Sequence, residues 1–402
     1  MPSRRIEPDL APLGADTKRR VALAVQAARD EILGLSHKIH ANPEPAFEEH
    51  RAAAWCAEIL GRHGFVVELP VGRLATAIRA TRRGGRGGAA PRIAILAEYD
   101  ALPGLGHGCG HNTMAASGVG AAIALASVAD DLPGEVVFLG TPAEERGSGK
   151  RVMIEDGLFD AIDAALLYHP CDRNHVDIAP LASTDVDVTF TGRQAHAASD
   201  PWEGRNALDA LILLFTSVGL WRQQLRPESR VHGIIVEGGT AANIIPDRTV
   251  ARFMVRSDND AGHRAMQARF RELCAAAARA TETTVEVTFS GGSRTMRTNR
   301  VLAERWISNA AAHGIADEGD DLSYGSTDMT NVSWVCPAIH PDLAMAPFPT
   351  PGHTIEFRDA AATPMADETT LMAATLVAET ATDLFADPGL VAAAWAEFRS
   401  AT

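Results

Sequence analysis

The segment GLGHGCGHN, residues 104–112, places His107, Cys109 and His111 within five positions among glycines. Cys109 and His111 lie two positions apart on a glycine-rich turn, so their sulfur and nitrogen atoms can point at neighbouring positions. Cysteine and histidine in such an arrangement favour a metal ion such as zinc. A structural alternative is open for this pair alone: Cys109 as a small core residue and His111 as a hydrogen-bonded turn residue.

A second polar motif, GTPAEE, ends in the adjacent carboxylates Glu144 and Glu145. Adjacent carboxylates crowded into a cleft raise each other's pKa unless cations neutralise them. Beside a metal, one carboxylate can ligate while the other takes a proton from water. Taken alone, the pair is more typical of a solvated loop or of the acidic first turn of a helix.

The elements that would position these residues form an α/β pattern. Residues 18–39 carry apolar positions at helical spacing, and three short apolar runs, residues 93–97, 136–139 and 164–167, are typical of strands buried on both faces. Helical segments separate these runs, which predicts a largely parallel sheet with covering helices. A polar motif follows each run, where open α/β sheets bind ligands. With the later motif PGHT, the residues placed there are Asp100, His107, Cys109, His111, Glu144, Glu145, His169 and His353. Five of these are candidate ligands: the Cys109–His111 pair, one carboxylate of the Glu144–Glu145 pair, His169 and His353. Five ligands suit two cations with a shared ligand better than one closed tetrahedral site.

The hydrophobic period changes near residue 183, where Val186, Val188 and Phe190 alternate with polar residues. Such alternation predicts a half-exposed antiparallel strand. The elements expected from there are a strand at 184–190, a helix at 206–225, strands at 231–236 and 249–255, a helix at 260–280 and a strand at 285–289. This is the split βαβ order of ferredoxin-like domains. We therefore predict an α/β domain with a largely parallel sheet, with a first part at 1–183 and a second at 293–402, around an inserted α+β ferredoxin-like domain at 184–292.

Composition restricts the partners and the compartment. The 402 residues carry a formal net charge of -14 and contain no long basic run, so we expect no nucleic-acid partner and a small substrate. Five scattered cysteines do not form a disulfide framework, which favours a reducing compartment. The amino-terminal segment has no apolar core of a signal peptide, and no apolar stretch is long enough to span a bilayer. We expect a cytoplasmic protein with no membrane partner.

Several motifs in a fixed order resemble one family. They are AEYDALPG, HGCGHN, GTPAEE, YHP, GRQAHA, GGTAANIIPD, GSTD and PGHT. The chain resembles the dinuclear metallo-amidohydrolases and metallopeptidases that include aminoacylases, carboxypeptidase G and auxin-conjugate hydrolases, most closely the p-aminobenzoyl-glutamate hydrolase subunit and related dipeptidases. The resemblance implies hydrolysis of the amide bond of an N-acyl or N-aroyl amino acid, or of a small dipeptide, by attack of a metal-bridging water. It also implies two divalent ions per subunit, zinc or manganese, with cobalt as a further possibility.

The resemblance assigns a role to each site residue. Glu144 would be the general base, and Asp100 would orient His111 as carboxylates do for metal-bound imidazoles. Glu98 occupies a position where other branches have a ligand histidine, so it is not assigned as a ligand, and neither is His107. The implied metal ligands are Cys109, His111, Glu145, His169 and His353, with Cys109 where other branches use a bridging aspartate.

The inserted domain resembles the lid and dimerisation domain of the family, which implies a homodimer or a higher homo-oligomer. His196 of GRQAHA would reach the neighbouring subunit's site and hold the reacting carbonyl oxygen, and Asn243 would help to bind substrate. Arg256 is a candidate for a substrate carboxylate, with a surface arginine at a strand end as the equal alternative. Arg146 departs from the glycines that close relatives carry after the paired glutamates, so it either shapes the site or points to solvent.

Three other functions remain open on the sequence. A thiol amidase would use Cys109 as nucleophile and a histidine as base, which leaves Glu144, Glu145 and His353 without a role. A catalytically silent protein that kept the metal site would have no need for Glu144. A hydrolytic deaminase would use the same water attack to release ammonia from a small aromatic or amidine-like amine.

Overall fold

The computed structural model describes residues 14–86, 91–178, 180–319 and 325–400. The chain forms two compact units. Unit 1 consists of Met1–Ile178, Arg297–Asp321 and Val332–Thr402, and unit 2 consists of Ala179–Met296 and Leu322–Asn331. Residues 325–331, which the sequence analysis placed in the second part of the first domain, belong to unit 2.

Unit 1 is built on a six-stranded sheet in the order β1-β2-β4-β3-β5-β13. The four strands from β4 to β13 are parallel, and β2 runs antiparallel to both of its neighbours. The three predicted apolar runs form β3, β4 and β5, which confirms the largely parallel sheet. The strand bounds are β1 (Val66–Glu68), β2 (Ile78–Arg83), β3 (Arg92–Ala97), β4 (Glu135–Gly140), β5 (Ala164–Leu166) and β13 (Ala338–Ile339).

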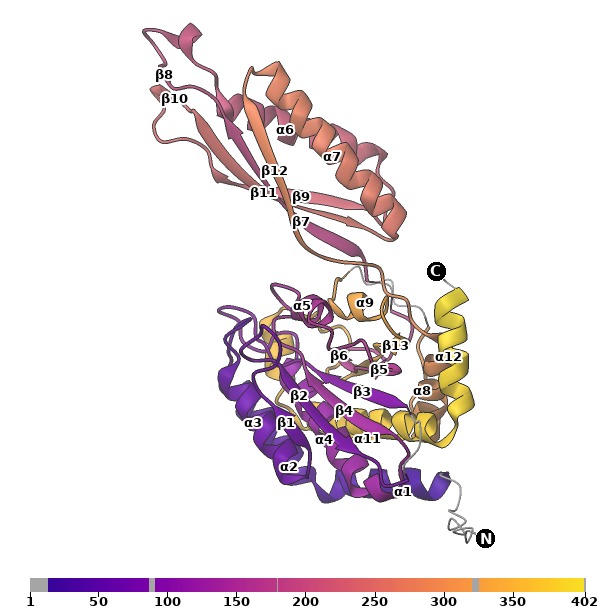
Figure 1. The fold of residues 1–402 in the computed structure, drawn as a ribbon. Helices are drawn as coiled ribbons and strands as arrows, with labels where there is room; N and C mark the ends of the chain where they lie inside the picture. The colour runs from indigo at the N-terminus through magenta and orange to yellow at the C-terminus, as the bar shows by residue number, and fades with distance from the viewer. Residues whose placement is uncertain (1–13, 87–90, 179, 320–324, 401–402) are drawn as a thin grey trace, which may run out of the picture. The chain divides into compact units, whose positions relative to one another are not determined.

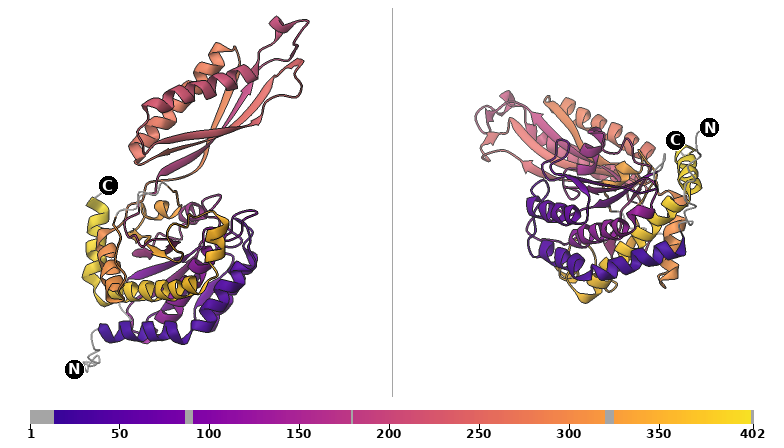
Figure 2. Two further views of the ribbon diagram at one scale, coloured as in Figure 1. Left: turned by 180° about the vertical axis from the view of Figure 1, so that it is seen from behind. Right: turned by 60° about the horizontal axis from the view of Figure 1, so that its bottom comes forward.

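Helix α4 (His111–Ser127) is the centre of the unit 1 core. It packs on β3 and β4, and α1, α2 and α11 cover it from outside (Figures 1 and 2). Small residues allow this close packing: a Cβ at Gly118 would lie 2.9 Å from the Cβ of Ala97. Residues 18–39, which carry apolar positions at helical spacing, form parts of two helices with a break at Ala28. Apart from the two long helices of unit 2, the α-helices of the described residues are α1 (Ala15–Ala27), α2 (Arg29–His40), α3 (His50–Arg62), α4, α5 (Gly149–Glu155), α8 (Arg300–Ala312), α9 (Met329–Val332), α10 (Ile355–Ala360), α11 (Pro364–Ala386) and α12 (Pro388–Ser400).

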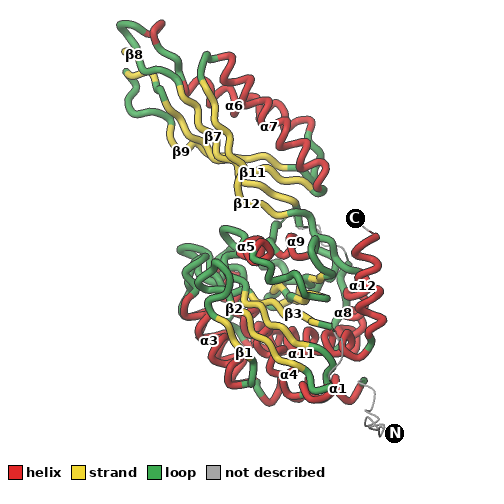
Figure 3. Tube along the Cα trace, in the orientation of Figure 1, coloured by secondary structure: helices red, strands yellow, loops and turns green. Residues whose placement is uncertain are grey.

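Unit 2 has the βαββαβ order that the sequence predicts. Its four-stranded antiparallel sheet runs β12-β7-β11-β9, and both helices pack on one face of it (Figure 3). The long elements are β7 (Ala182–Thr191), α6 (Ala207–Trp221), β9 (Arg230–Glu237), β11 (Arg248–Ser257), α7 (Asp260–Ala280) and β12 (Thr284–Ser293). A short antiparallel ribbon, the β8–β10 ribbon, pairs β8 (Ala195–His196) with β10 (Ile244–Ile245), which α6 and β9 separate in the chain. Across the described ranges, no helix is long and apolar enough to cross a membrane.

Candidate metal centre

The predicted site residues of unit 1 follow three neighbouring parallel strands. Asp100 follows β3, Glu144 and Glu145 follow β4, and His169 follows β5. Because the carboxyl ends of parallel strands meet at one edge of a sheet, these side chains converge. His353 comes from a distant loop, and its backbone N–H donates a 2.8 Å hydrogen bond to the Gly108 carbonyl.

His111 is positioned by the turn that precedes helix α4. Gly110 adopts a φ of 75°, in the left-handed region that favours glycine. A Cβ there would lie 2.7 Å from Pro170 Cγ and 2.9 Å from Met345 Cε, so the turn requires glycine for steric reasons as well. The helix begins at His111, whose side chain is fully buried.

Asp100 connects the two halves of the centre. Its Oδ1 lies 3.1 Å from His111 Nδ1, and its Oδ2 accepts a 2.9 Å hydrogen bond from the Glu145 backbone N–H. The Asp100 carbonyl is also 3.0 Å from His111 Nδ1. This arrangement makes Nδ1 the protonated nitrogen and directs Nε2 into the cluster, as carboxylates do for metal-bound imidazoles.

The five predicted ligands form two groups that share Cys109. One group is Cys109, His111 and His169, and the other is Cys109, Glu145 and His353; within each, the potential ligand atoms lie within 4.8 Å of one another. Ligand atoms on one tetrahedral zinc ion lie about 3.3–3.8 Å apart, given zinc–ligand bonds of about 2.0–2.3 Å. The Cys109 Sγ to His169 Nε2 distance is 3.5 Å, and the Glu145 Oε2 to His353 Nε2 distance is also 3.5 Å.

The cluster has an electrostatic imbalance that a cation would correct. Burial, followed by the nearby Glu145 carboxylate, raises the pKa of the Cys109 thiol well above its usual range. Burial also raises the pKa of Glu145, although His111 and His353 oppose the shift. A divalent cation reverses both effects because it favours the thiolate and the carboxylate forms.

Buried atoms without hydrogen bonds support the same conclusion. Glu98 Oε2, His111 Nε2 and Glu145 Oε1 are buried and have no hydrogen-bond partner. Buried polar atoms are nearly always paired, so three unpaired donor or acceptor atoms in one cluster need an explanation. The thiol, imidazole and carboxylate groups are the ligands that zinc and related divalent cations prefer. The residues present therefore fit a metal centre.

Glu144 lies beside the two groups. Its Oε2 is 4.0 Å from His111 Nε2, and its side chain is 10% exposed, which leaves a face open to water. Glu144 belongs to neither group that contains Cys109. Arg146, two residues further on, is exposed. His107 is buried, stacks on His40 and belongs to none of the groups of the described residues, so it stays outside the predicted ligand set.

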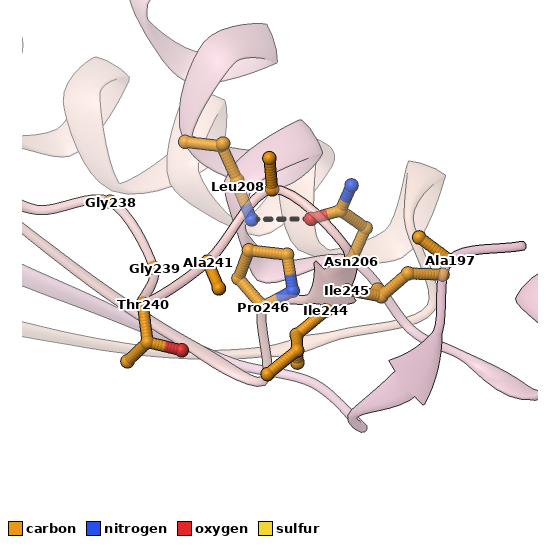
Figure 4. A pocket seen from close by; sticks show the side chains of 11 residues that line it. Ala197, Asn206, Leu208, Gly238, Gly239, Thr240, Ala241, Ile244, Ile245 and Pro246 are labelled. Carbon is orange, nitrogen blue, oxygen red and sulfur yellow. Dashed lines mark hydrogen bonds between the residues drawn. The ribbon is translucent and has the colours of Figure 1, made fainter.

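The predicted substrate residues lie in unit 2. His196 and Asn243 come together at the β8–β10 ribbon, where the Ala197 backbone N–H donates a 3.1 Å hydrogen bond to the Asn243 carbonyl. A hollow of about 480 Å³ beside them is lined by residues of both motifs and by the amino-terminal end of α6 (Figure 4). Arg256 lies eight residues beyond Arg248 on β11, roughly 26 Å along the strand. The structure therefore does not bring Arg256 to the β8–β10 ribbon.

Three buried residues near the centre were not assigned a role from the sequence. Asp342 Oδ1 lies 3.7 Å from His169 Nδ1, in the register that pairs β14 (Asp342–Ala344) with β6 (His169–Cys171). Glu98 and Lys150 form a fully buried ion pair of 2.5 Å. The three-residue strands near Asp342 carry no periodic signal. The pairing of Glu98 with Lys150 spans 52 positions and becomes visible only after folding.

Asp100→Asn is expected to weaken metal binding by about 10–100-fold. An asparagine has one acceptor oxygen, so its amide group would face either the His111 Nδ1–H or the Glu145 N–H. Calorimetric titration of the metal-free protein measures this effect. Asp163→Asn is the matched control, because Asp163 accepts the Arg92 N–H at the opposite end of β3. Equal metal affinities for both variants would contradict the orienting role of Asp100.

Comparisons with known proteins give one consistent result. Residues 94–381 match the sequence pattern of peptidase family M20/M25/M40. The Xaa-Arg dipeptidase of Mus musculus is 37% identical over 402 residues, covering 95% of this chain and 92% of the relative. A p-aminobenzoyl-glutamate hydrolase subunit of Escherichia coli (strain K12) is 30% identical, with 92% of each chain covered. A solved putative aminohydrolase from methicillin-resistant Staphylococcus aureus has a TM-score of 0.79 at 21% identity, covering 92% of this chain and all of that one. A dinuclear metal binding M20 peptidase of Bacillus subtilis has a TM-score of 0.71 at 21% identity, covering 90% and 99%.

The fold and the donor set define a metal-dependent hydrolase that acts on amide bonds. The chain belongs to peptidase family M20/M25/M40, as the ordered motifs of the sequence predict.

Proposed function

We propose that this protein hydrolyses the single amide bond of an N-acyl or N-aroyl amino acid, or of a small dipeptide, at a two-cation centre. The observation that carries the proposal is the pair of ligand groups that share Cys109, with Glu144 beside them and outside both. Cys109, His111 and His169 would hold one cation, and Cys109, Glu145 and His353 the other. When bound, divalent cations polarise the substrate carbonyl and lower the pKa of water towards about 7.

Glu144 provides the proton transfers in this scheme. Its side chain is held at the edge of the cluster and is 10% exposed, so it can reach a water molecule and the substrate. It accepts a proton from the attacking water and then delivers that proton to the departing amine. Arg146 is exposed and takes no part in these steps.

His196 supplies a hydrogen-bond donor for the carbonyl oxygen. Its Nδ1 accepts 3.1 Å hydrogen bonds from the backbone N–H groups of Ala198 and Ser199. The neutral ring therefore carries its proton on Nε2, which makes Nε2 a donor without any charge on the ring. The side chain is exposed on the β8–β10 ribbon, where the substrate or another subunit can approach it.

We propose that the β8–β10 ribbon enters the active site of the partner subunit, within a homodimer formed by unit 2. The support is an exposed apolar edge: β9 is the last strand of its sheet, and Ile234, Ile235 and Val236 on it are 63%, 49% and 55% exposed. An apolar edge strand in water promotes pairing with another chain. A second copy of β9 would cover this edge by forming a continuous sheet across a two-fold axis.

Ile234→Lys/Val236→Lys is expected to convert the dimer into a monomer. Both side chains are exposed, so the change leaves the core of unit 2 intact and adds like charges on both sides of the interface. Light scattering coupled to size exclusion measures the mass. Val66→Lys is the matched control, because Val66 is 70% exposed on β1, at the edge of the unit 1 sheet. A dimeric double lysine variant would refute β9 as the interface.

The names of the relatives suggest the substrate class. One describes a dipeptide that ends in arginine and the other an aroyl derivative of glutamate. Both contain one amide bond between an acyl group and an amino acid. We therefore propose that the amino acid side of the substrate carries a free carboxylate.

Cys109 serves better as a metal ligand than as a nucleophile in this structure. Burial raises the pKa of its thiol well above the usual range, whereas a reactive cysteine needs a lowered thiol pKa. Cys109 also lies within hydrogen-bonding distance of His169, at 3.5 Å, and inside both ligand groups. A thiol amidase would leave the second group, with Glu145 and His353, unexplained.

A substrate panel tests the proposed function. Zinc- or manganese-loaded protein is assayed on Xaa-Arg dipeptides, other dipeptides, N-acyl amino acids and p-aminobenzoyl-glutamate, with release of the free amino acid as the readout. Turnover is expected on at least one of these classes and is expected to disappear in chelator. Ammonia release without amide cleavage would instead identify a deaminase, and full activity in chelator would identify a thiol amidase.

A further inference from the structure

Glu98 is an acidic residue beside the metal-ligand cluster, and the buried ammonium group of Lys150 holds it in place. It follows β3 directly and is 1% exposed. Its Oε1 accepts a 2.5 Å hydrogen bond from Lys150 Nζ, in the first turn of α5, whose side chain is 0% exposed. Its other oxygen, Oε2, has no hydrogen-bond partner and lies 3.2 Å from His111 Nε2.

The contact between Glu98 Oε2 and His111 Nε2 needs a positive charge, either a proton on the imidazole or a cation between the two atoms. His111 Nδ1 faces the Asp100 carboxylate and carbonyl, so Nδ1 carries a proton and Nε2 is the nitrogen available to a cation. Glu98 Oε2 and His111 Nε2 are both buried without a hydrogen-bond partner, so the contact does not have the geometry of a hydrogen bond. The separation of 3.2 Å is close to the spacing of about 3.3 Å between two ligand atoms on one cation.

We propose that Glu98 is a further metal ligand, which binds through Oε2 beside His111 while Lys150 fixes the carboxylate through Oε1. This inference rests on the metal centre of the proposed function. Glu98, His111 and Glu144 form a third group whose potential ligand atoms lie within 4.8 Å of one another, and His111 joins it to the group of Cys109 and His169. Glu144 keeps the role of base in this assignment, because its Oε2 is 4.0 Å from His111 Nε2, whereas Glu98 Oε2 is 3.2 Å from the same atom.

The ion pair with Lys150 explains how a buried carboxylate can serve this role. A lone carboxylate at 1% exposure would become neutral or disrupt the core. The ammonium of Lys150 occupies one oxygen and keeps the group charged, so the second oxygen remains available in a fixed direction. If Glu98 had only a structural role, its ion pair with Lys150 would be sufficient. That role would not explain why Oε2 is buried beside His111 Nε2 without a hydrogen-bond partner.

Removing both members of the pair separates the two roles. Glu98→Gln/Lys150→Met removes both charges of the pair, and replacing a whole buried ion pair is commonly neutral for stability. Metal-free protein is titrated with Zn²⁺ by calorimetry, and the zinc content per subunit is measured after gel filtration. We expect two zinc ions in the wild type, and in the double variant a loss of at least about 100-fold in affinity for one of them, since even outer partners of ligands account for about 10–100-fold.

Glu379→Gln is the matched control, because Glu379 is a buried carboxylate that pairs with His313 away from the centre. The control is expected to bind zinc as the wild type does. Wild-type stoichiometry and affinity in the double variant would overturn the inference and leave the proposed function standing. A wild type that binds no zinc would overturn the proposed function as well.

Lys150→Met keeps the test decisive if the double variant does not fold. This change removes the ammonium that keeps Glu98 charged, so a cation that binds Glu98 would supply the missing positive charge. Zinc is then expected to raise the melting temperature of Lys150→Met by more than it raises that of the wild type. Equal shifts would overturn the assignment of Glu98 as a ligand.

Discussion

Glu144→Gln is expected to lower kcat by about 10²–10⁴-fold while the metal content stays at the wild-type value. Glutamine has the size of glutamate but cannot accept a proton at neutral pH. Because Glu144 lies outside both groups that contain Cys109, its loss should not release a cation. Steady-state kinetics on the best substrate of the panel, with metal analysis of the same samples, measures both quantities.

Glu145→Gln provides the contrast for this prediction. Glu145 Oε2 is 3.5 Å from His353 Nε2, inside a ligand group, so its replacement should release metal and lower activity together. If Glu144→Gln lost metal as Glu145→Gln does, Glu144 would be a ligand and not the base. An unchanged kcat in Glu144→Gln would remove it from the reaction altogether.

His196→Ala should lower kcat by about 10²–10³-fold, the effect of losing one donor to a developing oxyanion. The thermal stability should not change, because the side chain is exposed and its hydrogen bonds are those with the nearby Ala198 and Ser199 N–H groups. Gln194→Ala changes an exposed residue two positions before His196, so this variant is the control and should retain full activity. Unimpaired turnover in His196→Ala would refute its role.

Mixing two inactive variants tests whether His196 acts on the partner subunit. In a heterodimer of Glu144→Gln and His196→Ala, one site would combine an intact Glu144 with an intact His196 from the other chain. Random exchange makes half of the dimers heterodimers, so activity should recover to about a quarter of the wild-type value. If His196 acts within its own subunit, no intact site forms and the mixture stays inactive.

The sequence by itself determined the strands, the ligand residues to consider and the family. The apolar runs of β3, β4 and β5 are detectable because strands buried on both faces need continuous apolar residues. Unit 2 is detectable because a sheet with one buried face imposes a period of two. The clustered motifs around His111 and Glu145 lie on turns that follow these strands, so their convergence follows from the parallel order.

Only the tertiary structure decided which ligand atoms share a group. Cys109 joins His169, 60 positions away, to Glu145 and His353, and no local pattern contains that information. The same holds for the pairing of Glu98 with Lys150 and for the register of Asp342 beside His169. These contacts depend on long-range packing of turns and very short strands, where side-chain direction is set by neighbours distant in the chain and not by local periodicity.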